Sequence, residues 1–436
     1  MPGRFSALFV LLLVFVAVPA FGDPSRATLR YDGPHPGPLL AEVTREPTIR
    51  VRVGKRLASL DVLAVEGASG DVAVTGPAGS GAKVMRYRLP LRVARRGDAW
   101  LIRDGAGRAM RWRLPALYLT AEGGDRLLQI DTARYPGRLV LSPSRGETAP
   151  ADTFDVVNHV PLETYLPGVL ERELFPKWPL ETYKAQAVAA RSYALWEMTI
   201  ARGRAFDLES TTASQVYGGK ATNATAKTAV AETRGVVLAY DGRVVPAFFA
   251  SSTGGAGQDA VRAFPNRVED IAPLRGRAHG AWDQASPRYR WGPVLRDTAA
   301  LSRRIAAWGR RHEHPVEHLG TLARVEVSGR NRVGRPATFM LTNTAGRRYT
   351  LACESFRNAC NFTREGELPL PDGGRLFSSH VEVSVDGGRV MVSGGRGHGH
   401  GVGMSQWGAY GMAQAGHGHA AILRFYYPGA TLTRLY

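Results

Sequence analysis

Hydrophobic and polar residues alternate along most of the first third of the chain. Runs such as TIRVRVG at residues 48–54 and RYRLPLRVA at residues 86–94 are separated by Gly, Pro and Asp. A period of two is typical of half-buried β-strands, and turn residues between such runs are typical of antiparallel pairing. The pattern therefore predicts an all-β region over residues 23–148, a scaffold that carries no catalytic cluster.

The pattern becomes helical between residues 160 and 217. Residues 180–202 are rich in Ala, Tyr, Leu and Lys and contain neither Gly nor Pro, which predicts a long helix. Pro179 suits its first turn, because the missing N–H costs nothing there. A preceding helical stretch meets it at a Pro- and aromatic-rich elbow, LFPKWP at residues 174–179. We expect an α+β protein, β-rich, with a central long helix and several antiparallel strands.

Shorter elements are predicted after the long helix. A hairpin over residues 236–251 is expected to turn at Asp241-Gly242. A polar loop at residues 145–152 links the all-β region to the helical one. Further helices are predicted at residues 227–234, 296–311, 354–359 and 410–414, and further strands at residues 323–329, 337–343, 347–352, 381–385 and 390–394.

The first 22 residues have the composition of a secretory signal peptide. Arg4 precedes an apolar run over residues 7–18, and Ala20 and Gly22 are small residues at cleavage-site spacing. The run is too short to span a membrane as a helix. We therefore expect an exported protein of the periplasm or cell envelope, or an extracellular one, with no transmembrane segment in the mature chain. The predicted organisation is a signal peptide at residues 1–22, a β-rich region at 23–148 and a second region at 149–436.

Composition and charge restrict the function classes. With 44% hydrophobic and 22% charged residues, the chain can bury a core and is not disordered. Its formal net charge of +18 attracts polyanions, although solubility in an Arg-rich proteome explains that charge equally well. Nucleic acid is excluded as a partner, because no helix-turn-helix, zinc-finger or RNA-binding pattern accompanies the charge.

Glu173 is the main candidate for chemistry. It is expected where one helix ends and the next begins, beside Phe175 and Trp178. Apolar neighbours raise the pKa of a carboxyl and keep it protonated near neutrality, as a general acid requires. The alternative is a surface charge at a helix end. Glu171 and Glu181 are weaker candidates, the first on another helix face and the second in a first turn, where the helix dipole favours it.

Only two cysteines are present, Cys353 and Cys360. An exported location permits a disulfide between them. If both lay on one helix they would be about 10.5 Å apart, too far to bridge. A bridge needs Cys353 at a strand end and Cys360 on the following helix, and we favour this structural bridge over a reactive or metal site.

Several long blocks in one order resemble a known family. They are PLETYLPGVLERE, WPLE, KAQAVAARSYAL, STTASQVYGG, AVAETRGVVLAYDGRVVPAFFASSTGG and GHGVGMSQWGAYGMA. Together they resemble the sporulation protein D / LytB domain family, which contains stage II sporulation lytic transglycosylases and amidase-enhancer-like proteins. The resemblance runs from about residue 48 to residue 432 and implies the elongated, β-rich fold of that family.

The resemblance implies a peptidoglycan lytic transglycosylase that needs no cofactor. Such an enzyme cleaves MurNAc–GlcNAc glycan strands to 1,6-anhydroMurNAc ends with one Glu as acid and base, and here we expect strands stripped of stem peptides. The family's Glu falls on Glu173. The family commonly has Glu-Met-Pro there, whereas this chain has Pro one position later, at Pro176, and keeps Trp178 at its usual distance. The alternative is a non-catalytic amidase enhancer or glycan-binding module, with a cell-wall amidase as a possible partner.

Other candidate substrate-binding residues follow from these blocks. Arg191, in the middle of the long helix, pairs with Glu173, holds an acidic substrate group or extends to solvent. Gln215 and Tyr217 can hydrogen-bond sugar hydroxyls, although Tyr217 equally suits core packing. Ser252 lies in the SSTGG turn, which we interpret as part of the cleft because no Gly-x-Ser-x-Gly elbow surrounds it. The GHGVGMSQ block adds three candidates for the cleft wall: His400, Ser405 and Gln406.

No metal site is expected. Some sporulation members place zinc-binding Cys and His before the SQVY block, and those positions are Glu209, Ala213 and Ser214 here. A weaker alternative uses histidines on the Gly-rich segments, His398, His400, His417 and His419, but they have no acidic or Cys partner nearby in the sequence.

Overall fold

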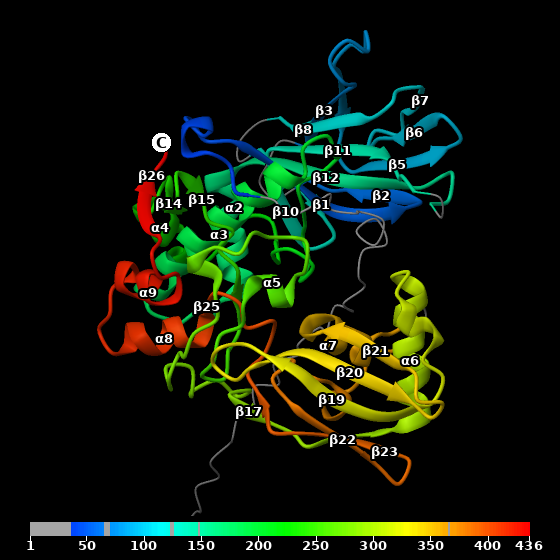
Figure 1. The fold of residues 1–436 in the computed structure, drawn as a ribbon. Helices are drawn as coiled ribbons and strands as arrows, with labels where there is room; N and C mark the ends of the chain where they lie inside the picture. Colours follow the sequence, from blue (N-terminus) through cyan, green and yellow to red (C-terminus); the bar gives the residue numbers. More distant parts are fainter. Residues whose placement is uncertain (1–35, 65–69, 123–125, 147–148, 365–366) are drawn as a thin grey trace, which may run out of the picture.

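The computed structural model describes residues 36–64, 70–122, 126–146, 149–364 and 367–436, so the predicted signal peptide lies outside the described residues. Three parts are visible in Figure 1: a β-rich lobe at the top, a central body with most of the helices, and a second lobe at the bottom. The chain passes from the first lobe into the body, leaves it to form the second lobe, and returns to the body at its end. This is the α+β fold that the sequence predicts.

Two sheets pack face to face in the N-terminal lobe. The larger has the order β13-β1-β12-β11-β8-β3-β4 and the smaller the order β2-β5-β6-β7. Buried Trp100 of the smaller sheet meets Phe154 of the larger edge to face, 5.4 Å between ring centroids. The strands are β1 (Thr48–Leu57), β2 (Ser59–Val62), β3 (Asp71–Thr75), β4 (Met85–Arg88), β5 (Leu91–Arg96), β6 (Ala99–Arg103), β7 (Ala109–Trp112), β8 (Leu117–Ala121), β11 (Arg138–Pro143), β12 (Phe154–Pro161) and β13 (Leu208–Glu209), with the hairpin β9 (Leu127–Ile130) and β10 (Ala133–Pro136) beside them and the short 3-10 helix η1 (Leu40–Glu42) before them.

The larger sheet continues past the predicted boundary at residue 148. Strand β12 pairs with β1 in a register that sets Thr48 opposite Pro161, and β13 adds to the outer edge of β1 in parallel. Since α2 (Leu162–Glu173) follows β12 directly, the sheet fixes where the first helix of the body begins.

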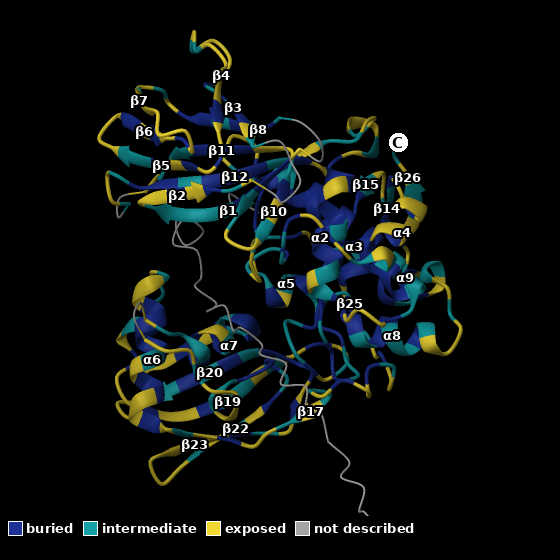
Figure 2. Ribbon diagram, turned by 180° about the vertical axis from the view of Figure 1, so that it is seen from behind, coloured by how far each residue is buried: buried dark blue, intermediate teal, exposed yellow. Residues whose placement is uncertain are grey.

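The long helix α3 (Leu180–Ile200) is the core of the central body. Most of its residues are buried, and α2, α4, α8, α9 and β14 pack around it; buried positions concentrate there in Figure 2. Asp241 and Gly242, with φ of 49° and 69°, form the predicted hairpin turn. The other elements of the body are α4 (Ala224–Glu232), β14 (Val236–Tyr240), β15 (Arg243–Val244), β16 (Phe249–Ala250), α5 (Ala260–Ala263), η2 (Ala272–Leu274), β25 (Met404–Ser405), α8 (Gln406–Gln414), α9 (His419–Tyr426) and β26 (Thr431–Arg434).

The second lobe leaves and re-enters the body through a short sheet formed by β17 (Arg290–Trp291) and β24 (Gly395–Arg396). Two three-stranded sheets and two helices build it, and Phe339 stacks on Phe356 between a sheet and a helix at 4.0 Å. Its other elements are β18 (Val294–Asp297), α6 (Thr298–Arg311), η3 (Pro315–His318), β19 (Leu322–Arg330), β20 (Pro336–Asn343), β21 (Arg348–Ala352), α7 (Cys353–Asn361), η4 (Asp372–Gly374), β22 (Glu382–Asp386) and β23 (Arg389–Ser393).

The predicted disulfide is wrong. Helix α7 begins at Cys353, one residue earlier than the sequence predicts, so both cysteines lie on it and are free and buried. Seven residues of helix separate them by about 10.5 Å, which no disulfide spans.

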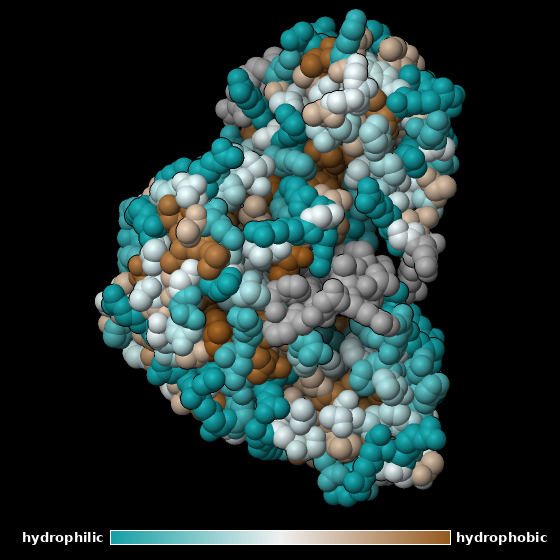
Figure 3. Space-filling model, turned by 45° about the horizontal axis from the view of Figure 1, so that its top comes forward, coloured by the Kyte–Doolittle hydropathy of each residue, from teal (hydrophilic) through white to brown (hydrophobic). Residues whose placement is uncertain are grey.

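The face of the molecule shown in Figure 3 is mainly hydrophilic. In Figure 3 hydrophobic side chains form small, separate patches on the face shown. Within the described part of the chain, no helix combines the length and apolarity that crossing a membrane requires.

Candidate active site

Glu173 is the last residue of α2, at the elbow that the sequence predicts. Leu174 leaves the helix with extended backbone (φ −122°, ψ 155°), and Pro179 then caps the start of α3. Tyr183 of α3 holds the elbow, because its hydroxyl donates to the carbonyl of Phe175 at 3.0 Å. Six residues therefore separate the two helices, and the carboxyl lies where the first of them ends.

Two donors from distant parts of the chain hold the carboxyl of Glu173. The backbone N–H of Val216 donates to Oε1 and the side-chain amide of Gln406 donates to Oε2, both at 3.1 Å. Burial raises the pKa of Glu173, and the two hydrogen bonds oppose that rise because they stabilise the charged form. The direction agrees with the prediction from its apolar neighbours.

The neighbouring carboxylates are held differently. Glu171 accepts from the backbone N–H groups of Thr222 and Asn223. Burial alone would raise the pKa of Glu181, but hydrogen bonds from Lys184 and His419 outweigh it and lower that pKa to about 2. The pKa of Glu173 is thus raised whereas that of Glu181 is lowered, and a raised pKa is what a general acid requires.

An aromatic cluster lies next to Glu173. Phe175 and Trp178 of the elbow meet Trp407 of α8, with ring centroids 5.2 Å (Phe175–Trp178), 5.5 Å (Phe175–Trp407) and 4.9 Å (Trp178–Trp407) apart. Tyr410 stacks on Trp178 at 4.9 Å. Since Trp407 follows Gln406, the amide that binds Glu173 and the aromatic cluster share one helix turn.

Asp283 joins the SSTGG turn to the start of α8. Its Oδ2 accepts from Ser252 Oγ (2.8 Å), Thr253 N (2.7 Å), Gly254 N (3.0 Å) and Ser405 Oγ (3.1 Å). Ser405 also caps α8 by accepting from the N–H of Gly408. Ser252 and Ser405 are completely buried, so in this structure they position the segment that carries Gln406 and do not reach a ligand.

His400 lies beside this turn and is neutral. Burial is the main cause that lowers its pKa to about 4, and its Nδ1 accepts from the N–H of Val402 at 3.0 Å. Arg335, from the β19–β20 hairpin of the second lobe, donates to the carbonyls of Thr253, Ala256 and His400. Gly401 leaves room for it, since a Cβ there would lie 2.2 Å from Nη1.

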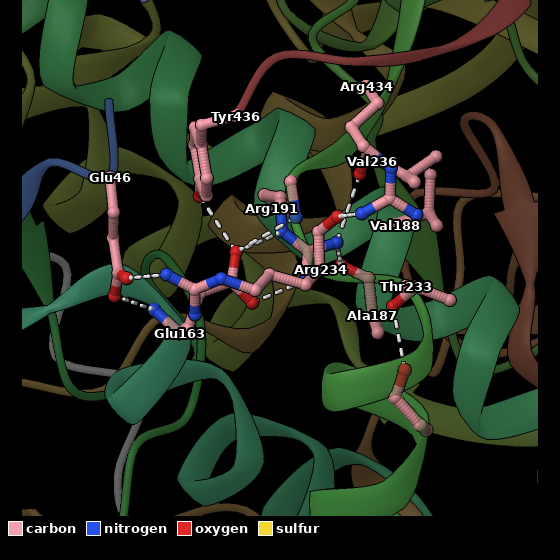
Figure 4. A network of polar contacts seen from close by, with 12 residues as sticks. Glu46, Glu163, Ala187, Val188, Arg191, Thr233, Arg234, Val236, Arg434 and Tyr436 are labelled. Carbon is pink, nitrogen blue, oxygen red and sulfur yellow. Dashed lines mark hydrogen bonds and ion pairs between the residues drawn. The ribbon is translucent and has the colours of Figure 1, made fainter. Parts of the chain in front are cut away.

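Arg191 pairs with Glu163 and neither contacts Glu173 nor reaches solvent. Its Nε and Nη2 donate to the two oxygens of Glu163 at 2.8 and 2.7 Å, and its Nη1 donates to the carbonyl of Val236 at 3.0 Å. Figure 4 shows this pair inside a larger network to which Tyr436 adds a hydroxyl bond to Glu163. Arg191 is 0% exposed, so the predicted contact with substrate is corrected to a structural role.

Gln215 and Tyr217 are likewise buried and occupied. Gln215 accepts from Tyr165 and donates to the carbonyl of Ala190, both at 3.1 Å. The hydroxyl of Tyr217 donates to Asn158 at 3.0 Å. Direct sugar binding by either is therefore corrected as well: they fix the loop that places the N–H of Val216 against Glu173.

The positions compared with a zinc site hold polar contacts. Glu209 forms an ion pair with buried Arg52, and the backbone N–H of Glu209 donates to Ser214 Oγ at 3.2 Å. His419 bonds Glu181, whereas His417 packs on Trp282. A search of the described residues finds no group of three or more His, Cys, Asp or Glu placed to hold a metal ion.

Known proteins similar to this chain indicate its family. The family described as Stage II sporulation protein, SpoIID, matches residues 151–240, which include Glu173 and Val216. An uncharacterized protein of Brachyspira hyodysenteriae is 32% identical over 302 residues, 68% of this chain and 72% of that protein. The chain belongs to the SpoIID family.

Two further relatives carry names. The amidase enhancer of Bacillus subtilis is 29% identical over 62% of this SpoIID-family chain, which spans only 40% of that protein. The stage II sporulation protein D of Bacillus amyloliquefaciens is 27% identical over 64% of the chain and 75% of its own length.

Sequence reasoning missed three residues that organise the site: Asp283, Arg335 and Glu163. Asp283 follows Trp282 in a segment without regular structure, and Arg335 lies in a hairpin turn of another lobe. No local pattern marks either. Glu163 is separated from Arg191 by 28 residues, and only the packing of α2 on α3 brings them together.

Proposed function

We propose that this protein is an exported peptidoglycan lytic transglycosylase with Glu173 as its single acid and base. The observation that carries the proposal is the carboxyl itself. It stands at a helix junction, its pKa is raised by burial, and two donors from separate sequence blocks hold it. Membership of the SpoIID family and the names of the relatives support a role in cell-wall processing.

The chemistry follows from one carboxyl that changes its protonation twice. Protonated Glu173 gives its proton to the glycosidic oxygen, and the C1–O bond of MurNAc breaks as C1 becomes oxocarbenium-like. The carboxylate then takes the proton of that sugar's C6 hydroxyl, whose oxygen bonds to C1 and closes the 1,6-anhydro ring. Water takes no part, so no second carboxylate is needed to activate it.

The two hydrogen bonds suit this sequence of steps. The N–H of Val216 and the amide of Gln406 stabilise the carboxylate that remains after the first transfer. Burial favours the protonated form that starts the reaction. A carboxyl balanced between these opposing effects can act as acid and then as base.

Mass spectrometry of peptidoglycan digests tests the proposal. Purified mature protein and Glu173→Gln are incubated with intact glycan and with glycan stripped of stem peptides. We expect anhydro-terminated fragments from wild type alone, and more of them from the stripped glycan. Products with reducing ends would refute the non-hydrolytic mechanism.

A second candidate is a non-catalytic protein that binds glycan and assists a cell-wall amidase. The similarity to a protein named amidase enhancer favours it. Absence of any fragment from either substrate, together with a faster amidase reaction when this protein is present, would favour this candidate.

A fractionation experiment with the full chain tests the proposed export to the envelope.

A further inference from the structure

Phe175 is exposed although it is a large aromatic residue. With 38% of its surface accessible, it is the one aromatic among the exposed large hydrophobic side chains of the described residues. It lies two residues after Glu173, on the elbow. Exposing an aromatic ring to water is unfavourable, and an exposed ring fixed beside a reactive group commonly serves as a contact surface for a ligand.

The ring of Phe175 is backed by a rigid wall. Its backbone carbonyl accepts from Tyr183 and from the N–H of Trp178 at 3.0 and 3.1 Å. Trp178 is 9% exposed and packs behind the ring of Phe175. Trp407 lies beside that ring, and the backbone N–H of Trp407 donates to the carbonyl of Ser251 at 3.0 Å. Because its backbone is held by hydrogen bonds and its ring packs against two other rings, Phe175 loses little conformational freedom when a ligand covers it.

The shape and polarity of this wall suit a sugar ring. A pyranose has an apolar face of C–H groups and an edge of hydroxyls. The rings of Phe175 and Trp407 lie side by side with their planes 54° apart, and the nearby Glu173 and Gln406 carry polar groups that suit the hydroxyl edge. An aromatic surface bordered by polar side chains fits such a ring better than it fits a purely apolar or purely charged ligand.

We propose that Phe175 and Trp407 form a stacking subsite for a pyranose ring of the glycan next to the bond that Glu173 cleaves. This rests on the proposed function in that the ligand is a glycan. It goes further by assigning the binding to two residues, one of which stands where the family commonly has Pro.

Calorimetric titration with N-acetylglucosamine tetramer tests the subsite. All variants carry Glu173→Gln, so that no bond is cut. Phe175→Ala is expected to raise Kd about fivefold to tenfold. Phe175→Tyr should bind like the parent, whereas Phe175→Leu, which keeps the apolar bulk without the ring, should bind like Phe175→Ala. Leu295→Ala, an exposed apolar residue of the second lobe, is the matched control.

The outcomes separate this inference from the proposed function. Equal Kd values for Phe, Leu and Ala at position 175, with unchanged thermal unfolding, would overturn the subsite even if wild type releases anhydro products. If wild type releases none but the variants follow the expected order, the subsite stands on a glycan-binding protein and the transglycosylase proposal fails.

Discussion

Replacing Arg191 by Met removes the cation that compensates a buried carboxylate. Arg191 is 0% exposed and Glu163 is 8% exposed, and the pair is joined by two hydrogen bonds of 2.8 and 2.7 Å. Met fills similar space without charge. The variant leaves Glu163 ionised in a buried site and the carbonyl of Val236 without the guanidinium that bonds it at 3.0 Å.

The expected loss is about 3–5 kcal/mol of unfolding free energy, the usual cost of leaving one member of a buried ion pair alone. Two donors to Glu163 survive, the hydroxyl of Tyr436 at 2.7 Å and the N–H of Gly235 at 3.3 Å. They compensate part of the charge, so we expect the lower half of that range.

The loss should depend on pH. In the wild-type protein burial would raise the pKa of Glu163, but Arg191 outweighs it and lowers that pKa below 4.5. The pair therefore stabilises the fold above pH 4.5, and this contribution is lost as pH falls through the lowered pKa. Without Arg191, burial raises the pKa of Glu163, and protonation relieves the penalty on acidification. The stability difference between the two proteins should shrink as pH falls from 7 to 4.

Urea denaturation followed by circular dichroism at several pH values measures this. Glu163→Gln/Arg191→Met is the control, since it buries neither charge: it should be more stable than Arg191→Met at pH 7. The difference in unfolding free energy between this double variant and wild type should narrow less as the pH falls. A loss below about 1 kcal/mol for Arg191→Met, or a loss equal at pH 7 and pH 4, would refute the reasoning.

Three further predictions concern the site and the second lobe. Gln406→Ala removes one donor to the carboxylate of Glu173, so its pKa rises further; the alkaline limb of the kcat/KM profile should move to higher pH, and kcat/KM at pH 7 should fall about tenfold. An unmoved limb would contradict this. Ser405→Ala removes the cap of α8 and one donor to Asp283, so we expect it to lower the unfolding free energy by about 1–2 kcal/mol and to reduce activity as well. A loss of activity without a loss of stability would contradict the positioning role. Burial raises the pKa of both Cys353 and Cys360 to about 12, so iodoacetamide should modify them only after unfolding, and reductant should leave the melting temperature unchanged. If the mass of the non-reduced protein is lower than that of the reduced protein by two hydrogens, the cysteines are bridged and this prediction is wrong.

Local pattern was enough for the helices around Glu173 and for the hairpin at Asp241-Gly242. In both cases neighbouring residues decide the conformation: Pro179 starts α3, and two residues at positive φ make the turn. The same reasoning misplaced the start of α7 by one residue. Ala352 precedes it with extended backbone and no side-chain cap, so no sequence signal marks that boundary, and the predicted disulfide depended on it.

Partners within the site were harder to predict. The sequence identified Glu173 and Gln406 separately, but their contact crosses 233 residues. Arg191, Gln215 and Tyr217 belong to the family blocks, yet burial directs their polar atoms inward. A block shared with a family can reflect the support of a site as much as contact with a ligand, and burial, which distinguishes the two, is a property of the tertiary structure.

Arg335 has a consequence for how the second lobe can change in evolution. Its guanidinium bonds three carbonyls of the body, so the near end of the lobe supplies hydrogen-bond donors to the body's loops. At the far end, the Gly387-Gly388 turn between β22 and β23 bonds within its own lobe, where the carbonyl of Gly388 accepts from the N–H of Thr298 at 3.0 Å, and a Cβ at either glycine would have no neighbour within 4 Å. Insertions and new appendages can accumulate at that tip at little cost. A domain exchanged for the whole lobe would have to bring its own guanidinium to the same three oxygens.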